Sequence, residues 1–332
     1  MTEHTTKTAL SLTVLGLVAV LSTTPGQAQA QSLNTTSYVS NAGSDANPCT
    51  DVATACATFQ KAVDKTAAGG QVTVVNTGNY GPFSINKSIN VTNDGAGEAS
   101  ILVSTGLGVF INAGVGDAVS LRGLVIDGNG AATSGVQIVQ AEAVHIQNSV
   151  IRNFEALGSF GIHFTPICNA QLFVSDTHIF NNGGDLKSAG ILVLPVKSGS
   201  ARVVLDRVHL DNNVTGIKVD GSQSAAGAGI HVAVRDSVIS GGASHGVWSF
   251  RPTGGGTSTV VLVERTSLLN NAGAGVLADT AAVVQISNSV AEYNATGASA
   301  VNGGRVFTYQ NNVIDNNVGE DLTPAAIVRT VK

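Results

Sequence analysis

Residues able to transfer protons or hold a charged ligand are sparse in this chain, and the candidates for a site lie between positions 163 and 279. Lys218, Arg251 and His163 are candidates for a catalytic base or for neutralising an acidic ligand. Asp220 could pair with Asp279 as acid and base if the fold held the two carboxylates about 10 Å apart, the wide edge of an inverting pair. The alternative is that both are solvated surface carboxylates.

Aromatic residues in the same region offer an apolar surface for a ligand. Trp248, the only tryptophan, and Phe250 could stack on a flat ring face, with Lys218 and His245 beside them. Trp248 could instead pack beneath segment 251–258, because large aromatic side chains are usually buried. His245 could equally be a turn residue. These four residues form the predicted substrate-binding set.

The three cysteines and the acidic residues indicate no metal site. Cys49 and Cys56 bracket a short loop and are the natural disulfide pair in an oxidising compartment, although sequence alone does not fix connectivity, and Cys168 is left over. No acidic cluster suggests a calcium site. We therefore predict neither a metal nor a cofactor.

Short repeated strands must position these residues. Between Ala201 and Ser249 the same pattern of strand, polar turn and strand occurs twice, as in stacked repeat proteins. One signature is a glycine that opens an apolar-x-apolar strand, at Gly108, Gly135, Gly161, Gly190, Gly216, Gly246, Gly275 and Gly297. The other joins two strands through a polar bend, as in LRGLVI, IQNSVI, VSDTHI, LDRVHL, VRDSVI, VERTSL, ISNSVA and YQNNVI.

Three short strands per repeat, with side chains alternating inward and outward, make a coil that buries its inner face only by stacking, with coils about 4.8 Å apart. The predicted inward column is Val119, Val144, Leu172, Val203, Val232, Val261, Val284 and Phe307. The predicted outward columns of the glycine strand are Phe110, Gln137, His163, Leu192, Lys218, Trp248, Leu277 and Ser299, and then Thr165, Leu194, Asp220, Phe250 and Asp279. Long connections at 153–160, 181–189, 220–229 and 251–258 are expected to border a groove over these columns.

Charged residues at the polar bends give a separate test of this alignment. Stacked coil on coil, they form two columns of alternating sign, which is the favourable arrangement for neighbouring strands. The columns are Asp176, Arg207, Asp236 and Arg265, and Asp206, Arg235 and Glu264. We interpret these charges as structural.

The chain is expected to contain a signal peptide followed by one elongated domain. Lys7, the apolar run 10–21 and the small residues ending at Ala30 are typical of a secretory signal peptide over 1–30, so we expect a secreted or periplasmic protein without membrane insertion. Residues 31–70 are predicted to hold a leader, the cysteine loop and a capping helix over 57–67, ended by the glycines at 69–70. Residues 71–332 are predicted to form about nine coils of an all-β solenoid.

The charge balance excludes some partners. Charged residues are only 12% of the chain, and the net charge is −5 without any basic cluster. Nucleic acids and anionic membranes are therefore poor candidates.

The repeat letters Gly-Ile-x-Val and Val-x-Asn-Ser-x-Ile, with the segment NPCTDVATACATF before the first coil, resemble secreted bacterial right-handed parallel β-helix proteins of the pectin-lyase-like superfold. The resemblance covers about Tyr38 to the C-terminus. It implies a right-handed parallel β-helix whose Gly-Ile-x-Val sheet binds sugar chains. His245-Gly246-Val247 is similar to a polygalacturonase motif, but Ser188-Ala189 and Val214-Thr215 stand where that family has aspartates.

Three functions follow as hypotheses. The first is a protein that binds, and in one version processes, polysaccharide along the glycine-strand groove. The second is a noncatalytic surface, matrix or adhesion protein that self-associates through an outward apolar stripe of Leu192, Leu194, Trp248, Phe250 and Leu277. The third is a polysaccharide lyase or glycoside hydrolase with a non-standard site. Fold alone does not choose among them.

Overall fold

The computed structural model describes residues 1–2, 32–225, 227, 229–323 and 327–328. The chain divides into two units, Met1–Ser32 and Leu33–Lys332, and the second contains the helix and all the described strands. The predicted signal peptide over 1–30 lies outside the described residues except at its first two positions. Within the described residues, no helix has the length and apolar character needed to span a membrane.

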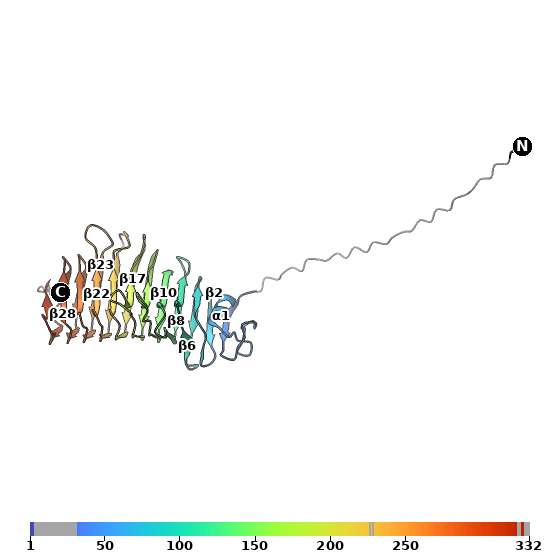
Figure 1. The fold of residues 1–332 in the computed structure, drawn as a ribbon, viewed down its shortest axis with the longest axis horizontal. Helices are drawn as coiled ribbons and strands as arrows, with labels where there is room; N and C mark the ends of the chain where they lie inside the picture. Colours follow the sequence, from blue (N-terminus) through green and yellow to red (C-terminus); the bar gives the residue numbers. More distant parts are fainter. Residues whose placement is uncertain (3–31, 226, 228, 324–326, 329–332) are drawn as a thin grey trace. The chain divides into compact units, whose positions relative to one another are not determined.

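The second unit is a parallel β-helix built from three sheets, each of which takes one strand from every coil (Figure 1). Sheet A contains β1 (Asn34–Val39), β2 (Thr66–Val74), β5 (Ile89–Thr92), β8 (Ala118–Arg122), β11 (Ala143–Gln147), β14 (Asn169–Ser175), β17 (Ser200–Asp206), β20 (Ile230–Arg235), β23 (Thr259–Glu264), β26 (Val283–Ser287), β29 (Arg305–Thr308) and β32 (Ile327–Val328). Sheet B contains β3 (Gly78–Asn79), β6 (Ala99–Leu102), β9 (Leu124–Asp127), β12 (Val150–Arg152), β15 (His178–Phe180), β18 (His209–Asp211), β21 (Val238–Ser240), β24 (Ser267–Leu269), β27 (Val290–Glu292) and β30 (Val313–Asp315). Sheet C contains β4 (Phe83–Ile85), β7 (Leu107–Asn112), β10 (Ser134–Gln140), β13 (Phe160–Phe164), β16 (Ala189–Val193), β19 (Ile217–Asp220), β22 (Val247–Phe250), β25 (Ala274–Asp279), β28 (Thr296–Val301) and β31 (Leu322–Thr323).

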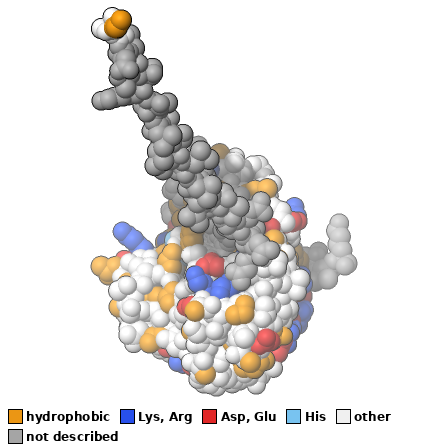
Figure 2. Space-filling view, turned by 90° about the vertical axis from the view of Figure 1, so that its right-hand side faces the viewer, with side chains coloured by type: hydrophobic (Ala, Val, Ile, Leu, Met, Phe, Trp, Pro, Cys, Tyr) orange, Lys and Arg blue, Asp and Glu red, His pale blue; other side chains and the backbone are white. Residues whose placement is uncertain are grey.

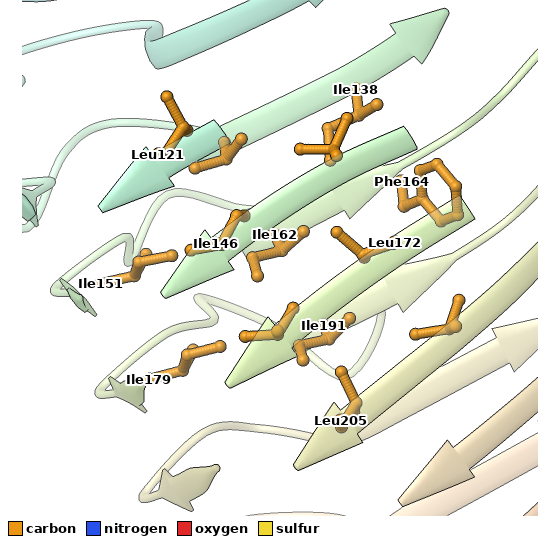
Figure 3. Close-up of a cluster of buried hydrophobic side chains, with 14 of the residues drawn as sticks. Leu121, Ile138, Ile146, Ile151, Ile162, Phe164, Leu172, Ile179, Ile191 and Leu205 are labelled. Carbon is orange, nitrogen blue, oxygen red and sulfur yellow. The ribbon is translucent and has the colours of Figure 1, made fainter. Parts of the chain in front are cut away.

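The predicted solenoid is confirmed, with ten strands in each of sheets B and C against the nine coils expected. The predicted inward column follows the observed strand pairing from Val119 to Val284. At the last coil the alignment is wrong by one residue, because Val284 pairs with Val306 and Phe307 pairs with the outward Gln285. Figure 3 shows how the inward side chains of neighbouring coils fill the space between the sheets.

The recurring glycines are explained by close approach of successive coils in sheet C. A Cβ atom on Gly216 would lie 2.5 Å from the carbonyl oxygen of Gly246, and one on Gly135 would lie 2.6 Å from that of Gly161. Such distances are too short for any side chain. The glycine signature therefore marks the place where each sheet C strand begins.

The corner between sheets A and B carries the predicted charge ladder. Arg207 Nε lies 2.7 Å from Asp176 Oδ1, and Arg265 Nε lies 2.8 Å from Asp236 Oδ1. These four bend residues adopt positive φ angles, between 48° and 51° for Asp176, Arg207 and Asp236 and 46° for Arg265. The ladder confirms the coil alignment at this corner.

The corner between sheets B and C carries a buried ladder of asparagines instead. Asn271 Nδ2 donates to Asn294 Oδ1 at 2.8 Å, and Asn294 Nδ2 donates to Asn317 Oδ1 at 3.2 Å. Asn182 Nδ2 donates in the same way to Asn213 Oδ1 at 2.9 Å. Each side-chain amide thus donates a hydrogen bond to the asparagine of the next coil. Such partners are what polar groups in a protein interior require.

Helix α1 (Phe59–Lys65) packs on the first coil. Thr58 caps its N-terminus, and the Phe59 ring contacts the rings of Tyr80 and Phe83 at centroid distances of 5.1 and 5.0 Å. The helix is shorter than predicted, because β2 begins at Thr66 and the glycines at 69–70 lie within that strand. The face of the molecule in Figure 2 carries scattered side chains of both charge signs.

The predicted disulfide joins Cys49 to Cys56 beside this helix. Cys168 is a free, half-buried thiol whose sulfur lies 3.5 Å from the carbonyl oxygen of Ala141.

Candidate functional site

The outer face of sheet C carries the predicted site residues in the predicted order. Strand pairing places Leu192 next to Lys218, Lys218 next to Trp248, and Trp248 next to Leu277. The remaining neighbours in the column follow the same register, with Phe110, Gln137 and His163 before Leu192 and Ser299 after Leu277. The outward column of sheet C is therefore confirmed from Phe110 to Ser299.

Lys218 and Trp248 form the centre of this face. The Lys218 ammonium nitrogen lies 4.4 Å from the centroid of the Trp248 ring system, a cation–π contact of about 0.5–1 kcal/mol at an exposed site. Trp248 is half-buried, and its indole nitrogen has no hydrogen-bond partner within the described residues. A ligand ring could stack on the covered indole face only after Lys218 moves aside.

His245 is held in place by the next coil. Its Nδ1 accepts the backbone N–H of Ala274 at 2.9 Å, and its ring meets the Trp248 ring edge-on at 5.8 Å. Burial lowers the pKa of His245 below its usual value, partly opposed by the charge of Asp279. The imidazole thus supports the edge of Trp248 and fits the turn-residue alternative.

The two candidate carboxylates lie in one column but are kept apart. Asp220 pairs with Phe250 and Phe250 with Asp279, so two strand spacings, about 10 Å, separate the acids, with an aromatic ring between them. Asp220 Oδ1 accepts the N–H of Ser222 at 2.9 Å. Asp279 Oδ1 accepts hydrogen bonds from the Thr280 hydroxyl at 2.7 Å and the Asn302 amide at 2.9 Å. Both carboxylates therefore stabilise turns.

Arg251 lies directly after Phe250, where the chain leaves sheet C. Its backbone N–H donates to the carbonyl oxygen of Asp279 at 3.2 Å. Its Nε is buried and has no hydrogen-bond partner among the described residues. Arg251 therefore lies beside the Trp248 strand with its Nε closed off from solvent, and its role in ligand binding stays a prediction.

His163 belongs to a different part of sheet C. Leu192 separates it from Lys218, and the Phe160 ring covers it at a centroid distance of 4.6 Å. A small apolar cluster of Phe160, Ala189, Leu192 and Leu194 surrounds this position. Burial lowers the pKa of His163 to about 4, so its imidazole is neutral at pH 7.

The four long connections do not border one groove. Segments 153–160 and 181–189 join sheet B to sheet C, whereas 220–229 and 251–258 join sheet C to sheet A on later coils. One hollow of about 370 Å³ lies over sheet C, at its α1 end, lined by Gln60, Pro82, Phe83, Ser84, Leu107 and Phe110. Hollows that are lined entirely by residues the structure describes also lie on the outer face of sheet A.

The outer face of sheet A is a feature that sequence reasoning missed. A hollow of about 280 Å³ there has outward Val204, Ala233, Val260 and Leu262 as its floor, with Arg202 and His231 beside them. A smaller hollow of about 150 Å³ adjoins it through Arg202. The signal was available, because apolar Val204, Ala233 and Leu262 occupy outward positions of VVLD, VAVRD and VLVE, where side chains that face solvent are usually polar.

Other outward histidines lie away from sheet C. On sheet B, His178 Nε2 lies 2.8 Å from Asp211 Oδ2. On sheet A, the His145 ring stacks on the Phe173 ring at 4.7 Å. The described residues contain no group of three or more His, Cys, Asp or Glu side chains arranged to hold a metal ion.

No protein-family model matches this sequence, and no curated protein does so either. Among solved structures, the chain is similar to pectate lyase Pel9A, with a TM-score of 0.56 and 13% sequence identity over 89% of this chain and 77% of that one. A weaker match is the GH136 lacto-N-biosidase from Eubacterium ramulus, with a TM-score of 0.45 and 12% sequence identity, covering 89% of this chain and 68% of that one. At these identities the comparison shows the fold alone: the chain is a parallel β-helix with the architecture of a pectate lyase.

Proposed function

We propose that this protein binds an acidic polysaccharide on the outer face of sheet C, around Lys218 and Trp248. The observation that carries the proposal is the half-buried Trp248 beneath the Lys218 ammonium, 4.4 Å from the ring centroid. A cation placed over an aromatic ring suits a sugar that has both an apolar C–H face and a carboxylate. The pectate lyase architecture, in which an acidic sugar polymer is the named substrate, agrees with this class of ligand.

Phe250 and Arg251 would complete the binding surface. Phe250 is half-buried and follows Trp248 by two residues on β22, so both point outward from the same strand. Arg251, which follows Phe250 directly, adds a second positive charge at the end of the strand. An acid group bound by Lys218 could therefore be met by Arg251 at the end of the strand.

Binding without cleavage is the form of the proposal that the geometry favours. Asp220 and Asp279 are engaged in turns and separated by Phe250, and His163 lies beyond Leu192 in an apolar cluster. A lyase or hydrolase would need Lys218, Arg251 or His245 to act as the base, since those are the basic groups beside Trp248. Release of unsaturated or reducing ends from pectin or alginate would establish that alternative.

Sheet C exposes less apolar surface for self-association than the sequence predicts. In the expected apolar stripe, Leu192 is only 5% exposed and Leu277 only 8% exposed. Sheet C therefore presents isolated apolar groups instead of a continuous patch of the size that protein contacts use.

The test is a binding titration with acidic and neutral oligosaccharides of equal length. We expect Lys218→Ala and Trp248→Ala each to weaken binding of the acidic oligosaccharide at least tenfold. Lys61→Ala, which removes an equal charge from the exposed side of α1, is the matched control and should bind like wild type. Equal affinity in all four proteins would contradict the proposal. From the signal-peptide pattern over 1–30 we also propose a secreted or periplasmic location, which N-terminal sequencing of the mature chain would test.

A further inference from the structure

We propose that the hollow on the outer face of sheet A is a second binding site, for an oligosaccharide that bears carboxylate or sulfate groups. It is separate from the site on sheet C and does not depend on the function proposed there. Its floor is formed by outward side chains of three consecutive strands, Val204 of β17, Ala233 of β20, and Val260 and Leu262 of β23. All four side chains are half-buried, so the floor is apolar and reachable by solvent.

One margin of this floor carries the positive charge of Arg202, with His231 beside it. Arg202 and His231 are neighbours in the strand register and both are exposed. Neither has a carboxylate partner within the part of the chain that the structure describes. The outward column to which they belong contains no acid: it consists of Ala143, Gln171, Arg202, His231, Val260, Val283 and Arg305.

The opposite margin differs because its charges are already paired. There Arg235 Nε lies 3.5 Å from Glu264 Oε2, and Asp206 is engaged by Arg207. An incoming anion is therefore attracted to the Arg202 side and gains nothing from the other. This asymmetry indicates that the ligand carries negative charge along one edge.

The smaller adjoining hollow extends this positive margin with hydrogen-bonding groups. Asn169, Gln171 and Ser200 line it together with Arg202. The Ser200 hydroxyl donates to Asn169 Oδ1 at 2.8 Å, which leaves the Asn169 amide nitrogen directed to other partners. Amide and hydroxyl groups beside an arginine suit sugar hydroxyls and a carboxylate or sulfate.

The dimensions exclude a second copy of this chain as the occupant. The three neighbouring strands span about 10 Å and outward residues along a strand are about 7 Å apart, so the floor covers on the order of 70 Å². A stable protein interface needs about 800 Å² from each partner. A peptide strand is also unsuitable, because the backbone hydrogen-bonding groups of sheet A lie in the sheet plane and pair with neighbouring strands. A sugar chain, with an apolar face and polar edge, meets both constraints.

The test counts binding sites by titration calorimetry on the full-length protein, with a short oligogalacturonate, its sulfated counterpart and a neutral oligosaccharide of equal length as probes. The variants are Arg202→Ala and Ala233→Glu on sheet A, Lys218→Ala on sheet C, and Lys61→Ala as the charge-matched control. We expect Arg202→Ala to weaken one site at least tenfold for the acidic probes, and Ala233→Glu to abolish that site by placing an anion on its floor. Lys218→Ala should leave this site intact.

Each outcome separates the two sites. Loss in the sheet A variants alone supports this inference and contradicts the function proposed for sheet C. Loss in Lys218→Ala alone, with wild-type binding in both sheet A variants, overturns this inference and supports the sheet C proposal. If the sheet A variants lose one binding site and Lys218→Ala loses another, both proposals are supported. If the wild-type protein binds none of the acidic probes, both proposals are overturned.

Discussion

Sheets A and C present their outer faces with the same strand spacing, yet the two faces differ in what covers them. On sheet C, outward side chains cover one another: Lys218 of one coil lies over Trp248 of the next, and Phe160 covers His163 within one strand. On sheet A, the apolar residues Val204 and Leu262 remain half-exposed beneath a hollow. The comparison teaches that Lys218 and Phe160 cover their neighbours on this part of sheet C, whereas Val204, Ala233 and Leu262 leave a hollow above themselves on sheet A.

The largest expected effect concerns the backbone that makes sheet C so tight. Gly216→Ala should destabilise the protein by about 3 kcal/mol or more, because its Cβ would meet the Gly246 carbonyl oxygen at 2.5 Å. Chemical denaturation measures the change. Gly116→Ala is the control, since a Cβ there meets no atom within 4 Å, and similar losses in both variants would refute the close-approach explanation.

A pH dependence should distinguish His163 on sheet C from His145 on sheet A. The folded-state pKa of His163 is about 4 against 6.5 for the free side chain, so between these values the unfolded chain binds a proton that the folded protein does not. Stability contributed by neutral His163 is therefore present above pH 6.5 and falls by about 3 kcal/mol as the pH drops to 4. Burial also lowers the pKa of His145, and the same sign applies there.

Unfolding free energies measured from pH 7 to pH 4 for wild type, His163→Phe and His145→Phe check this prediction. We expect His163→Phe to flatten the dependence more than His145→Phe does, because burial shifts His163 further. An unchanged slope in His163→Phe would show that its imidazole is not shielded from water.

Substitutions in the asparagine ladder and in the charge ladder should lower stability by smaller and unequal amounts. Asn294→Ala removes a fully buried amide, which is the acceptor of the Asn271 backbone N–H and side-chain amide, so it should cost about 2 kcal/mol. Arg207→Ala removes an exposed ion pair and should cost much less than Asn294→Ala, because solvent screens the interaction. Denaturation of both variants in low and high salt checks the pair, and a larger loss for Arg207→Ala would reverse our assignment of the corners.

The sequence predicts the coil and its register well because both depend on repeated local patterns. The glycines are set by backbone contact, and the charge ladder fixes one corner, so residues such as Lys218 and Trp248 could be placed side by side in advance. The predicted inward column is wrong at Val306 and Phe307. Both residues are apolar, so the alternation of apolar and polar residues does not indicate which of the two points inward. The predicted helix end fails because Gly69 and Gly70 lie inside a strand.

The site itself is less predictable because it depends on side-chain conformation and on loop placement. Alternation places Trp248 outward but does not say that Lys218 lies over its ring. It also does not show that Phe250 stands between Asp220 and Asp279, or that the long connections divide between two edges of sheet C. The hollow on sheet A was not predicted, because the outward apolar stripe inferred from the sequence lies on the glycine strand alone.

The central claim, that a ligand reaches the Lys218–Trp248 pair on sheet C, is tested most directly by intrinsic fluorescence. Trp248 is the only tryptophan in the chain, so its emission reports on this face alone. Titration with an acidic oligosaccharide should change the Trp248 emission in a saturable way, and Lys218→Ala should shift the midpoint at least tenfold. Emission that stays constant while calorimetry records binding would place the ligand elsewhere and contradict the claim.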